Sequence, residues 1–223
     1  MSLEASPEAQ AALNLFHRRE LSQGADAPLV YMVHGRAGDA GVMWPFRRVL
    51  PSQANIVAPQ AFLQDRVGGY SWWDIEAPAA QRKGDVLRAA DTLSTFIEKS
   101  RQYYELQPPY LIACGFSQGG ILLSALLQRM PTFFRCIALL ASEVYQLDRV
   151  ELLGDSAQWT EVLLVHGSQD DVIPLSRAEQ SQRYLNDLGF NVTLHVDPVG
   201  HKVGAAGMRV LKQWFEGQLA GEL

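Results

Sequence analysis

One serine in this 223-residue chain lies in a setting that could make it a nucleophile. Ser117 is the centre of Gly115-Phe-Ser-Gln-Gly119, which follows the apolar run Tyr110–Cys114 and precedes the apolar, helix-like segment 120–130. A G-x-S-x-G motif between a strand and a helix is typical of a sharp turn that exposes the serine hydroxyl. The pentapeptide alone would also suit an ordinary turn with a solvated serine. The strand-like and helix-like segments on either side of it favour the role of a nucleophile for Ser117.

A serine hydroxyl needs an imidazole to accept its proton and a carboxylate to orient that imidazole. Of the five histidines, His201 is the candidate base, because it ends the late loop Asp197-Pro-Val-Gly-His201, just after a predicted strand. The other four lie in the N-terminal segment, within a strand or at a strand end before a glycine. Structural roles are expected for them: His17, His34, His166 and His195.

Two adjacent carboxylates compete for the third position. Asp170 and Asp171 both follow the apolar run that ends in His166, and only one of them can point at the histidine. The other is expected to be a turn or helix-cap carboxylate ahead of Leu175, and the residue types alone leave the choice open. In either case the chain order is Ser, Asp, His, which is that of the α/β-hydrolases.

Attack of a serine on a carbonyl group also needs two N–H groups where negative charge develops on the carbonyl oxygen. Gln118, directly after the serine, is expected to supply one, and the Gly-rich loop His34–Asp39 to supply the other. A third feature is the stretch Val67–Asp74, in which Trp72 and Trp73 are neighbours. Such aromatic residues are consistent with a wall of the substrate pocket, and packing in the core is the alternative.

Short apolar runs that predict strands alternate with amphipathic segments that predict helices. The strands are expected at Leu29–Val33, Ile56–Ala58, Tyr110–Cys114, Cys136–Leu140, Val162–Val165 and Val192–Val196. The helices are expected at Val42–Leu50, Gly84–Leu106, Gln118–Met130, Leu175–Leu188 and Ala205–Leu219. This alternation predicts one α/β domain over residues 1–223, with a mostly parallel central sheet and helices on both faces. Functional loops of such sheets gather at the carboxyl ends of the strands.

The N-terminal segment, residues 1–24, is polar and rich in alanine, with one helix expected from Pro7 to Leu21 and no chemistry assigned. It lacks the apolar stretch of a signal peptide, and no run is long enough to span a bilayer, so a cytoplasmic protein is expected.

A net charge of −5 without a basic run argues against nucleic acid and anionic membranes as partners. Cys114 and Cys136 are expected to be buried thiols, and no spacing suggests a metal site.

These motifs together resemble the phospholipase/carboxylesterase family, which includes acyl-protein thioesterases, from about Leu29 to the C-terminus. The resemblance rests on His34-Gly with a nearby Gly-Asp, Trp72-Trp73-Asp74, Gly115-Phe-Ser-Gln-Gly119, His166-Gly-x-x-Asp170-x-Val-Ile-Pro174 and Gly200-His201. It implies an α/β-hydrolase fold and a triad of Ser117, Asp170 and His201. Many members have an apolar residue where Arg36 stands here. The Arg36 N–H becomes the expected second oxyanion donor, while its side chain could bind a substrate anion or form a salt bridge.

The resemblance implies a carboxylesterase that works through an acyl-enzyme, needs no cofactor and takes a small-molecule ester or thioester. Hydrolysis of acyl-protein thioesters or of lysophospholipids is the alternative within the family. A catalytically inactive hydrolase fold that serves as a binding protein is a more remote alternative. Relatives are often monomers or homodimers, and stable membrane insertion is not expected.

Overall fold

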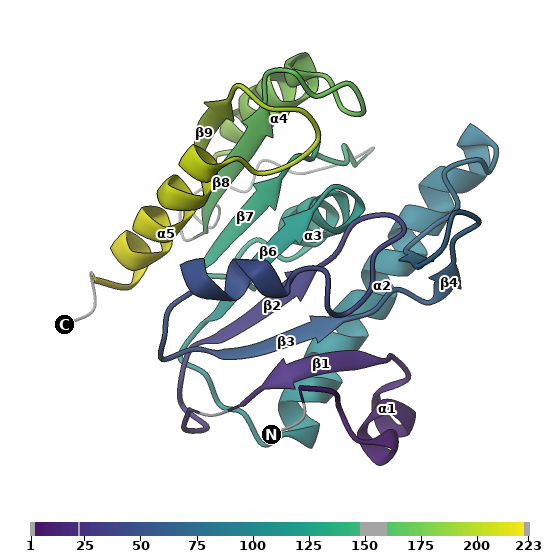
Figure 1. Cartoon of the computed structure of the whole chain (residues 1–223), viewed down its shortest axis with the longest axis vertical. Helices are drawn as coiled ribbons and strands as arrows, with labels where there is room; N and C mark the ends of the chain where they lie inside the picture. The colour runs from purple at the N-terminus through teal and green to yellow at the C-terminus, as the bar shows by residue number, and fades with distance from the viewer. Residues whose placement is uncertain (1–2, 22, 148–159, 221–223) are drawn as a thin grey trace.

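A computed structural model describes residues 3–21, 23–147 and 160–220 of the chain (Figure 1). Seven strands form one sheet in the order β1-β3-β2-β6-β7-β8-β9, in which every neighbouring pair is parallel except β1 with β3. The strands are β1 (His17–Glu20), β2 (Leu29–Val33), β3 (Asn55–Pro59), β6 (Leu111–Phe116), β7 (Cys136–Leu140), β8 (Glu161–Gly167) and β9 (Asn191–Asp197). A separate hairpin pairs β4 (Leu63–Gln64) with β5 (Tyr70–Ser71).

Helices cover both faces of the sheet. They are α1 (Pro7–Leu13), the 3₁₀ helix η1 (Trp44–Val49), α2 (Ala79–Tyr103), α3 (Gln118–Arg129), α4 (Leu175–Asp187) and α5 (Ala205–Ala220). One core cluster joins α1, α2, α3 and α4 to the sheet, and a second cluster joins η1 and α5 to the opposite face (Figure 1). Side chains of β2 alternate between these clusters, since Tyr31 packs in the first and Met32 in the second. The expected α/β-hydrolase architecture is confirmed.

The N-terminal segment differs from the expectation. The helix that was expected to reach Leu21 ends at Leu13, followed by Asn14 in the left-handed conformation with φ of 57°. The chain then runs as β1, with His17 opposite Pro59 of β3. Because β3 would otherwise present a bare edge, this long-range pairing outweighs the local helical preference. The segment expected as helix Val42–Leu50 is mainly the 3₁₀ helix η1, with Pro45 in its first turn.

Parallel register places the carboxyl ends of β6, β8 and β9 along one edge of the sheet (Figure 1). Phe116 of β6 pairs with Leu140, and Gly167 of β8 pairs with Asp197. The residues that follow these strands include Ser117, Asp170 and His201. The sheet therefore presents all three candidate residues on the same edge.

Two thiols lie inside the sheet. Cys114 of β6 and Cys136 of β7 are fully buried and unbridged. Burial away from water raises the pKa of Cys114 to about 12 and raises that of Cys136 as well. Both thiols therefore stay protonated at neutral pH, and Cys114 is a residue of the core although it stands three positions from Ser117.

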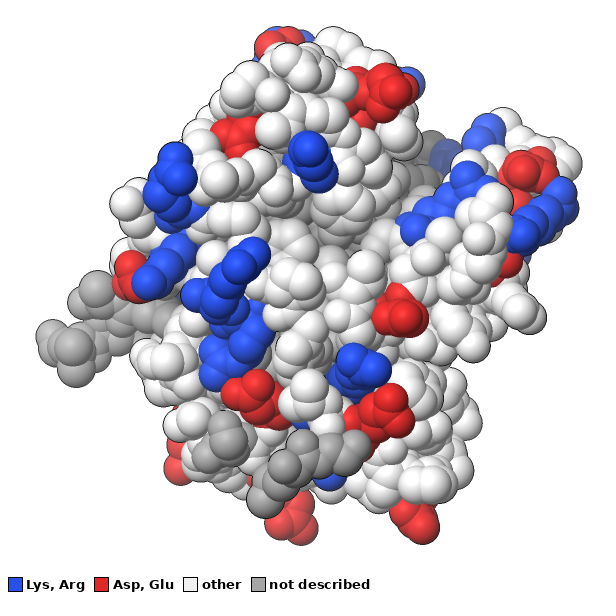
Figure 2. Space-filling model, viewed as in Figure 1, with Lys and Arg blue, Asp and Glu red and all other residues white. Residues whose placement is uncertain are grey.

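Charged side chains of both signs are interspersed on the face shown in Figure 2. Both signs also gather over the region of the β4–β5 hairpin, where Arg66 forms ion pairs with Asp74 and Glu76. In the described parts of the chain, no helix is long and apolar enough to cross a membrane.

Candidate active site

Ser117 occupies a strained turn between β6 and α3. Its φ of 51° and ψ of −118° lie in a region that residues other than glycine rarely adopt. The turn is held on both sides, because the Ser117 N–H donates to the Leu140 carbonyl at 2.9 Å and the Ser142 hydroxyl donates to the Ser117 carbonyl at 3.0 Å. A Cβ at position 119 would collide with the Val33 carbonyl, so the motif needs glycine there.

The three candidate residues form one hydrogen-bonded series. His201 Nδ1 lies 2.8 Å from Asp170 Oδ2, and His201 Nε2 lies 3.1 Å from Ser117 Oγ. An ionised carboxylate can only accept hydrogen bonds, so Nδ1 carries a proton and the Nδ1–H group donates a hydrogen bond to Asp170. In the neutral imidazole Nε2 is then the acceptor, and the Ser117 hydroxyl donates to it. The tautomer set by Asp170 is the one that can take a proton from serine.

Asp170, and not Asp171, is the carboxylate that faces the histidine. The Asp170 side chain is fully buried, and its Oδ1 accepts the N–H groups of Val172 at 2.9 Å and Ile173 at 2.8 Å. Burial acts to raise its pKa, but these N–H groups and His201 outweigh burial and hold the pKa below the ordinary value. Asp171 is exposed to solvent.

The loop that carries His201 is fastened to the loop that carries Asp170. The Gln169 N–H donates to the Val199 carbonyl at 2.9 Å, and the Ser168 N–H donates to the Asp197 carbonyl at 2.7 Å. The ring of His201 also packs against Phe116, with centroids 5.1 Å apart. These contacts fix the distance between the imidazole and its two partners.

Two backbone N–H groups near Ser117 are available to a ligand. Within the described residues, no hydrogen-bond acceptor is found for the N–H of Arg36 or for the N–H of Gln118. Gln118 is the first residue of α3, where N–H groups have no partner in the helix and favour negative charge. Arg36 follows Gly35, whose Cβ, if it had one, would lie 3.0 Å from Ser117 Cβ. The loop after β2 therefore packs directly on the serine.

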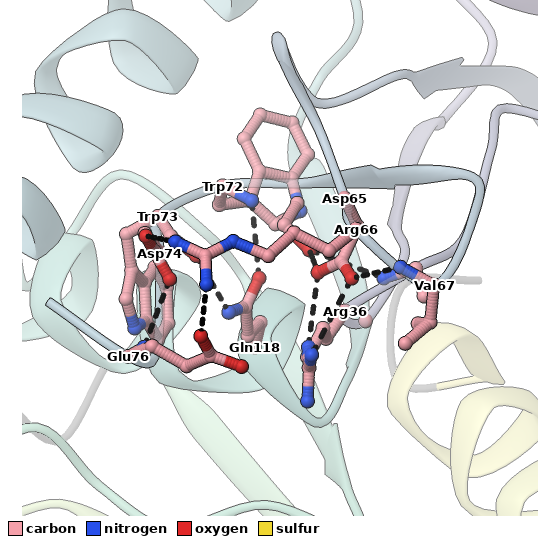
Figure 3. Close-up of polar contacts among 12 residues, drawn as sticks. Arg36, Asp65, Arg66, Val67, Trp72, Trp73, Asp74, Glu76 and Gln118 are labelled. Carbon is pink, nitrogen blue, oxygen red and sulfur yellow. Dashed lines mark hydrogen bonds and ion pairs between the residues drawn. The ribbon is translucent and has the colours of Figure 1, made fainter.

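The side chain of Gln118 joins the serine turn to the tryptophan stretch (Figure 3). Its Oε1 accepts the Trp72 N–H at 3.0 Å, and its Nε2 donates to the Trp73 carbonyl at 3.1 Å. Trp72 also donates its indole N–H to the His34 carbonyl at 2.8 Å. Trp72 is 1% exposed and belongs to the core, as the packing alternative expected. Trp73 is 6% exposed and packs in the same core cluster, and it also lines a cavity of about 150 Å³ beside the hairpin.

The Arg36 side chain forms an ion pair. Its Nε lies 2.9 Å from Asp65 Oδ2 and its Nη2 lies 3.4 Å from Asp65 Oδ1 (Figure 3). The salt bridge expected as one role of this side chain is therefore present. Neither Asp65 nor Ser71 belongs to a recognised motif, and their contacts with the loop of Arg36 were not predicted from the sequence. The signal available in the sequence was the pair Gly68-Gly69, a dipeptide that marks turns and lies between the two residues.

The remaining histidines bind loop backbone or nearby side chains. His34 Nε2 accepts the Ala61 N–H at 2.9 Å, and His166 Nε2 lies 2.8 Å from the Ile173 carbonyl. His17 bonds to the Leu15 carbonyl and the Tyr104 hydroxyl, and His195 bonds to Asp197. In the parts of the chain that the structure covers, no group of three or more metal-ligating side chains is assembled.

Comparisons with known proteins identify similar chains that are named as carboxylesterases or as a thioesterase. A probable carboxylesterase of rice, Oryza sativa subsp. japonica, is 26% identical over 67% of this chain, and the match covers 58% of the rice protein. Acyl-protein thioesterase 1 of Gibberella zeae is 27% identical over 81% of this chain and 91% of its own length. The crystal structure of a Bacillus cereus carboxylesterase shares the fold, with a TM-score of 0.84, 17% identity and coverage of 95% of this chain and 98% of that one.

The sequence model of one family matches nearly the whole chain. This match, to the phospholipase/carboxylesterase family, runs from residue 20 to residue 218 and includes β2 to β9 with the serine turn and both partner loops. By this match, the chain belongs to the phospholipase/carboxylesterase family.

Proposed function

We propose that the protein is a serine hydrolase that cleaves carboxylic esters through an acyl-enzyme, with Ser117, His201 and Asp170 as its catalytic residues. The proposal is carried by one observation, the unbroken series of hydrogen bonds from the buried carboxylate through the imidazole to the serine hydroxyl. Family membership supports ester hydrolysis as the reaction class. No cofactor takes part.

In the proposed first half-reaction, Ser117 Oγ attacks the carbonyl carbon of the ester while His201 Nε2 takes the hydroxyl proton. The resulting imidazolium is stabilised by Asp170, with Nδ1–H donating to Oδ2. The negative carbonyl oxygen accepts hydrogen bonds from the N–H groups of Gln118 and Arg36. The intermediate then expels the alcohol, which takes the proton from Nε2, and the acyl group stays on Ser117.

The second half-reaction releases the acid. A water molecule gives a proton to His201 Nε2 and attacks the acyl-enzyme carbonyl. The same two N–H groups stabilise the second tetrahedral intermediate. Its collapse breaks the bond to Ser117 Oγ, which recovers the proton from the imidazole, so the enzyme returns to its starting state.

A fluorophosphonate probe tests the proposal directly. The purified protein is expected to be labelled at one residue, Ser117, because the probe reacts with serines activated by a neighbouring base. Peptide mass spectrometry identifies the residue, and heat-denatured protein is the control because its triad is dispersed. A folded protein that is not labelled would support the inactive, ligand-binding alternative.

The acyl chain length separates a general carboxylesterase from a lipid thioesterase or lysophospholipase. We expect kcat/KM on p-nitrophenyl esters to be highest for short chains, C2 to C6, and to fall toward C16. This order is expected because hydrolysis of long acyl chains requires a long apolar groove, which a general carboxylesterase does not need. A maximum at C12 to C16 would instead favour the activity named for the Gibberella zeae relative.

A further inference from the structure

The β4–β5 hairpin is the support of the loop that offers the Arg36 N–H. The Tyr70 N–H donates to the Gly38 carbonyl at 2.7 Å, which joins β5 to the loop. A Cβ at position 69 would collide with the Ala37 carbonyl, so the two segments are in direct backbone contact. The position of the loop therefore depends on the hairpin.

The loop itself contains a tight turn in an unfavourable conformation. The Gly38 N–H donates to the Gly35 carbonyl at 3.3 Å, with Arg36 and Ala37 as the two central residues. Ala37 has a φ of 59°, in the left-handed region that a residue with a Cβ rarely adopts. Local preference alone would relax this turn, so contacts from outside must hold it.

One carboxylate collects those contacts (Figure 3). Asp65 Oδ2 accepts from Arg36 Nε at 2.9 Å and from the Ser71 hydroxyl at 2.6 Å. The Ser71 oxygen in turn accepts the Ala37 N–H at 3.2 Å. Asp65 is thus bonded to both central residues of the turn, to one directly and to the other through Ser71.

Asp65 is itself held in place. Its Oδ1 accepts the Val67 N–H at 3.1 Å, and its own N–H donates to the Gly69 carbonyl at 2.9 Å. The side chain is 8% exposed and the Arg36 side chain is 32% exposed, so the pair is partly shielded from solvent. Hydrogen bonds from Arg36, Ser71 and Val67 hold the pKa of Asp65 well below its ordinary value. The carboxylate is therefore charged throughout the neutral range.

We propose that Asp65 is a positioning residue for ester hydrolysis, which fixes the Gly35–Gly38 turn so that the Arg36 N–H faces the oxyanion. This inference rests on the proposed function of the site. Asp65 touches neither the substrate nor the reacting atoms. It acts through the Arg36 side chain and through Ser71, and it aligns an N–H group that is needed most when negative charge has formed.

The test compares the variants Asp65→Asn and Ser71→Ala with the matched control Glu76→Gln. Loss of a complete oxyanion donor costs about 10² to 10³ in kcat. A misplaced donor in Asp65→Asn is expected to lower kcat by about 10 to 10² with KM changed less than about 3-fold, and Ser71→Ala to lower it by roughly 3 to 10. Glu76 is also an acidic hairpin residue paired with an arginine, but its partner Arg66 is exposed, so Glu76→Gln is expected to stay within about 2-fold.

A second readout separates positioning from general damage. Sulfur accepts hydrogen bonds weakly, so a thionoester gains less than an oxygen ester from the two N–H groups. The ratio of kcat/KM for an oxygen ester to that for its thionoester is expected to fall in Asp65→Asn and to stay unchanged in Glu76→Gln. A loss of rate by the same factor for both esters, a rise in KM alone or an unchanged kcat would each overturn the inference.

A second variant and a labelling control cover the two outcomes that could otherwise be ambiguous. If circular dichroism shows that Asp65→Asn does not fold, the ester ratio measured in Ser71→Ala decides. That variant keeps the ion pair between Arg36 and Asp65 and removes the hydroxyl that joins Asp65 to Ala37. Fluorophosphonate labelling of the wild type separates this inference from the proposed function. A labelled and active wild type with an unaffected Asp65→Asn refutes the role of Asp65 alone, whereas an unlabelled wild type refutes the proposed function.

Discussion

Replacing Ser117 by alanine is expected to lower kcat for ester hydrolysis by on the order of 10⁴-fold or more. The methyl group cannot form the acyl-enzyme, so any remaining turnover must come from water attacking a bound ester near the two N–H groups. KM is expected to change little, because Ser117 is 9% exposed and contributes a small part of the binding surface. Steady-state kinetics on p-nitrophenyl acetate give both constants.

A matched control accompanies this variant. Ser176 is an exposed serine on α4, and Ser176→Ala is expected to keep kcat within about 2-fold of the wild type. Substitution of an exposed hydroxyl disturbs neither the turn after β6 nor the loops of Asp170 and His201. Near-normal esterase activity in a folded Ser117→Ala protein would refute the assignment of the nucleophile.

The second large effect is expected at Asp170. In Asp170→Asn the amide can donate to His201 Nδ1, which favours the tautomer with the proton on Nε2. That nitrogen then cannot accept the Ser117 proton, and the imidazolium loses its negative partner. The expected fall in kcat is roughly 10³- to 10⁴-fold, similar to the cost of the same change in other serine hydrolases. Single-turnover acylation with a p-nitrophenyl ester measures the step that is affected.

Asp171 gives the control for this variant, since it is the neighbouring carboxylate and is exposed. Asp171→Asn is expected to change kcat by less than about 2-fold. Asp170 Oδ1 also accepts two N–H groups, so thermal unfolding of Asp170→Asn must be recorded beside its activity. A larger loss of activity in Asp171→Asn than in Asp170→Asn would reverse the assignment of the carboxylate.

Much of the site could be predicted because its residues follow strands. Ser117 and His201 are 84 positions apart, yet each follows a strand whose carboxyl end lies on the same edge of a parallel sheet. The expected strands Leu29–Val33 and Cys136–Leu140 match β2 and β7 residue for residue. Apolar runs of this kind are local signals, and the order of parallel strands then places the loops together.

Other features depended on contacts that no local pattern encodes. The N-terminal strand β1 forms because β3 offers it an edge, and the sequence of residues 14–20 does not specify that partner. The choice between Asp170 and Asp171 depends on the two N–H groups of Val172 and Ile173, which turn the first carboxylate inward. The pairing of Arg36 with Asp65 spans 29 positions and joins two irregular segments, so spacing alone could not reveal it.

The burial of both native thiols has a practical consequence for labelling experiments. Because Cys114 and Cys136 are enclosed by the sheet, an alkylating dye added under native conditions has no cysteine within its reach on the folded molecule. A single cysteine engineered on the outer surface can therefore carry a fluorophore or spin label without prior removal of the natural ones. The rate at which the dye reacts with the two buried thiols of the unmodified chain would in turn measure how often its central strands open.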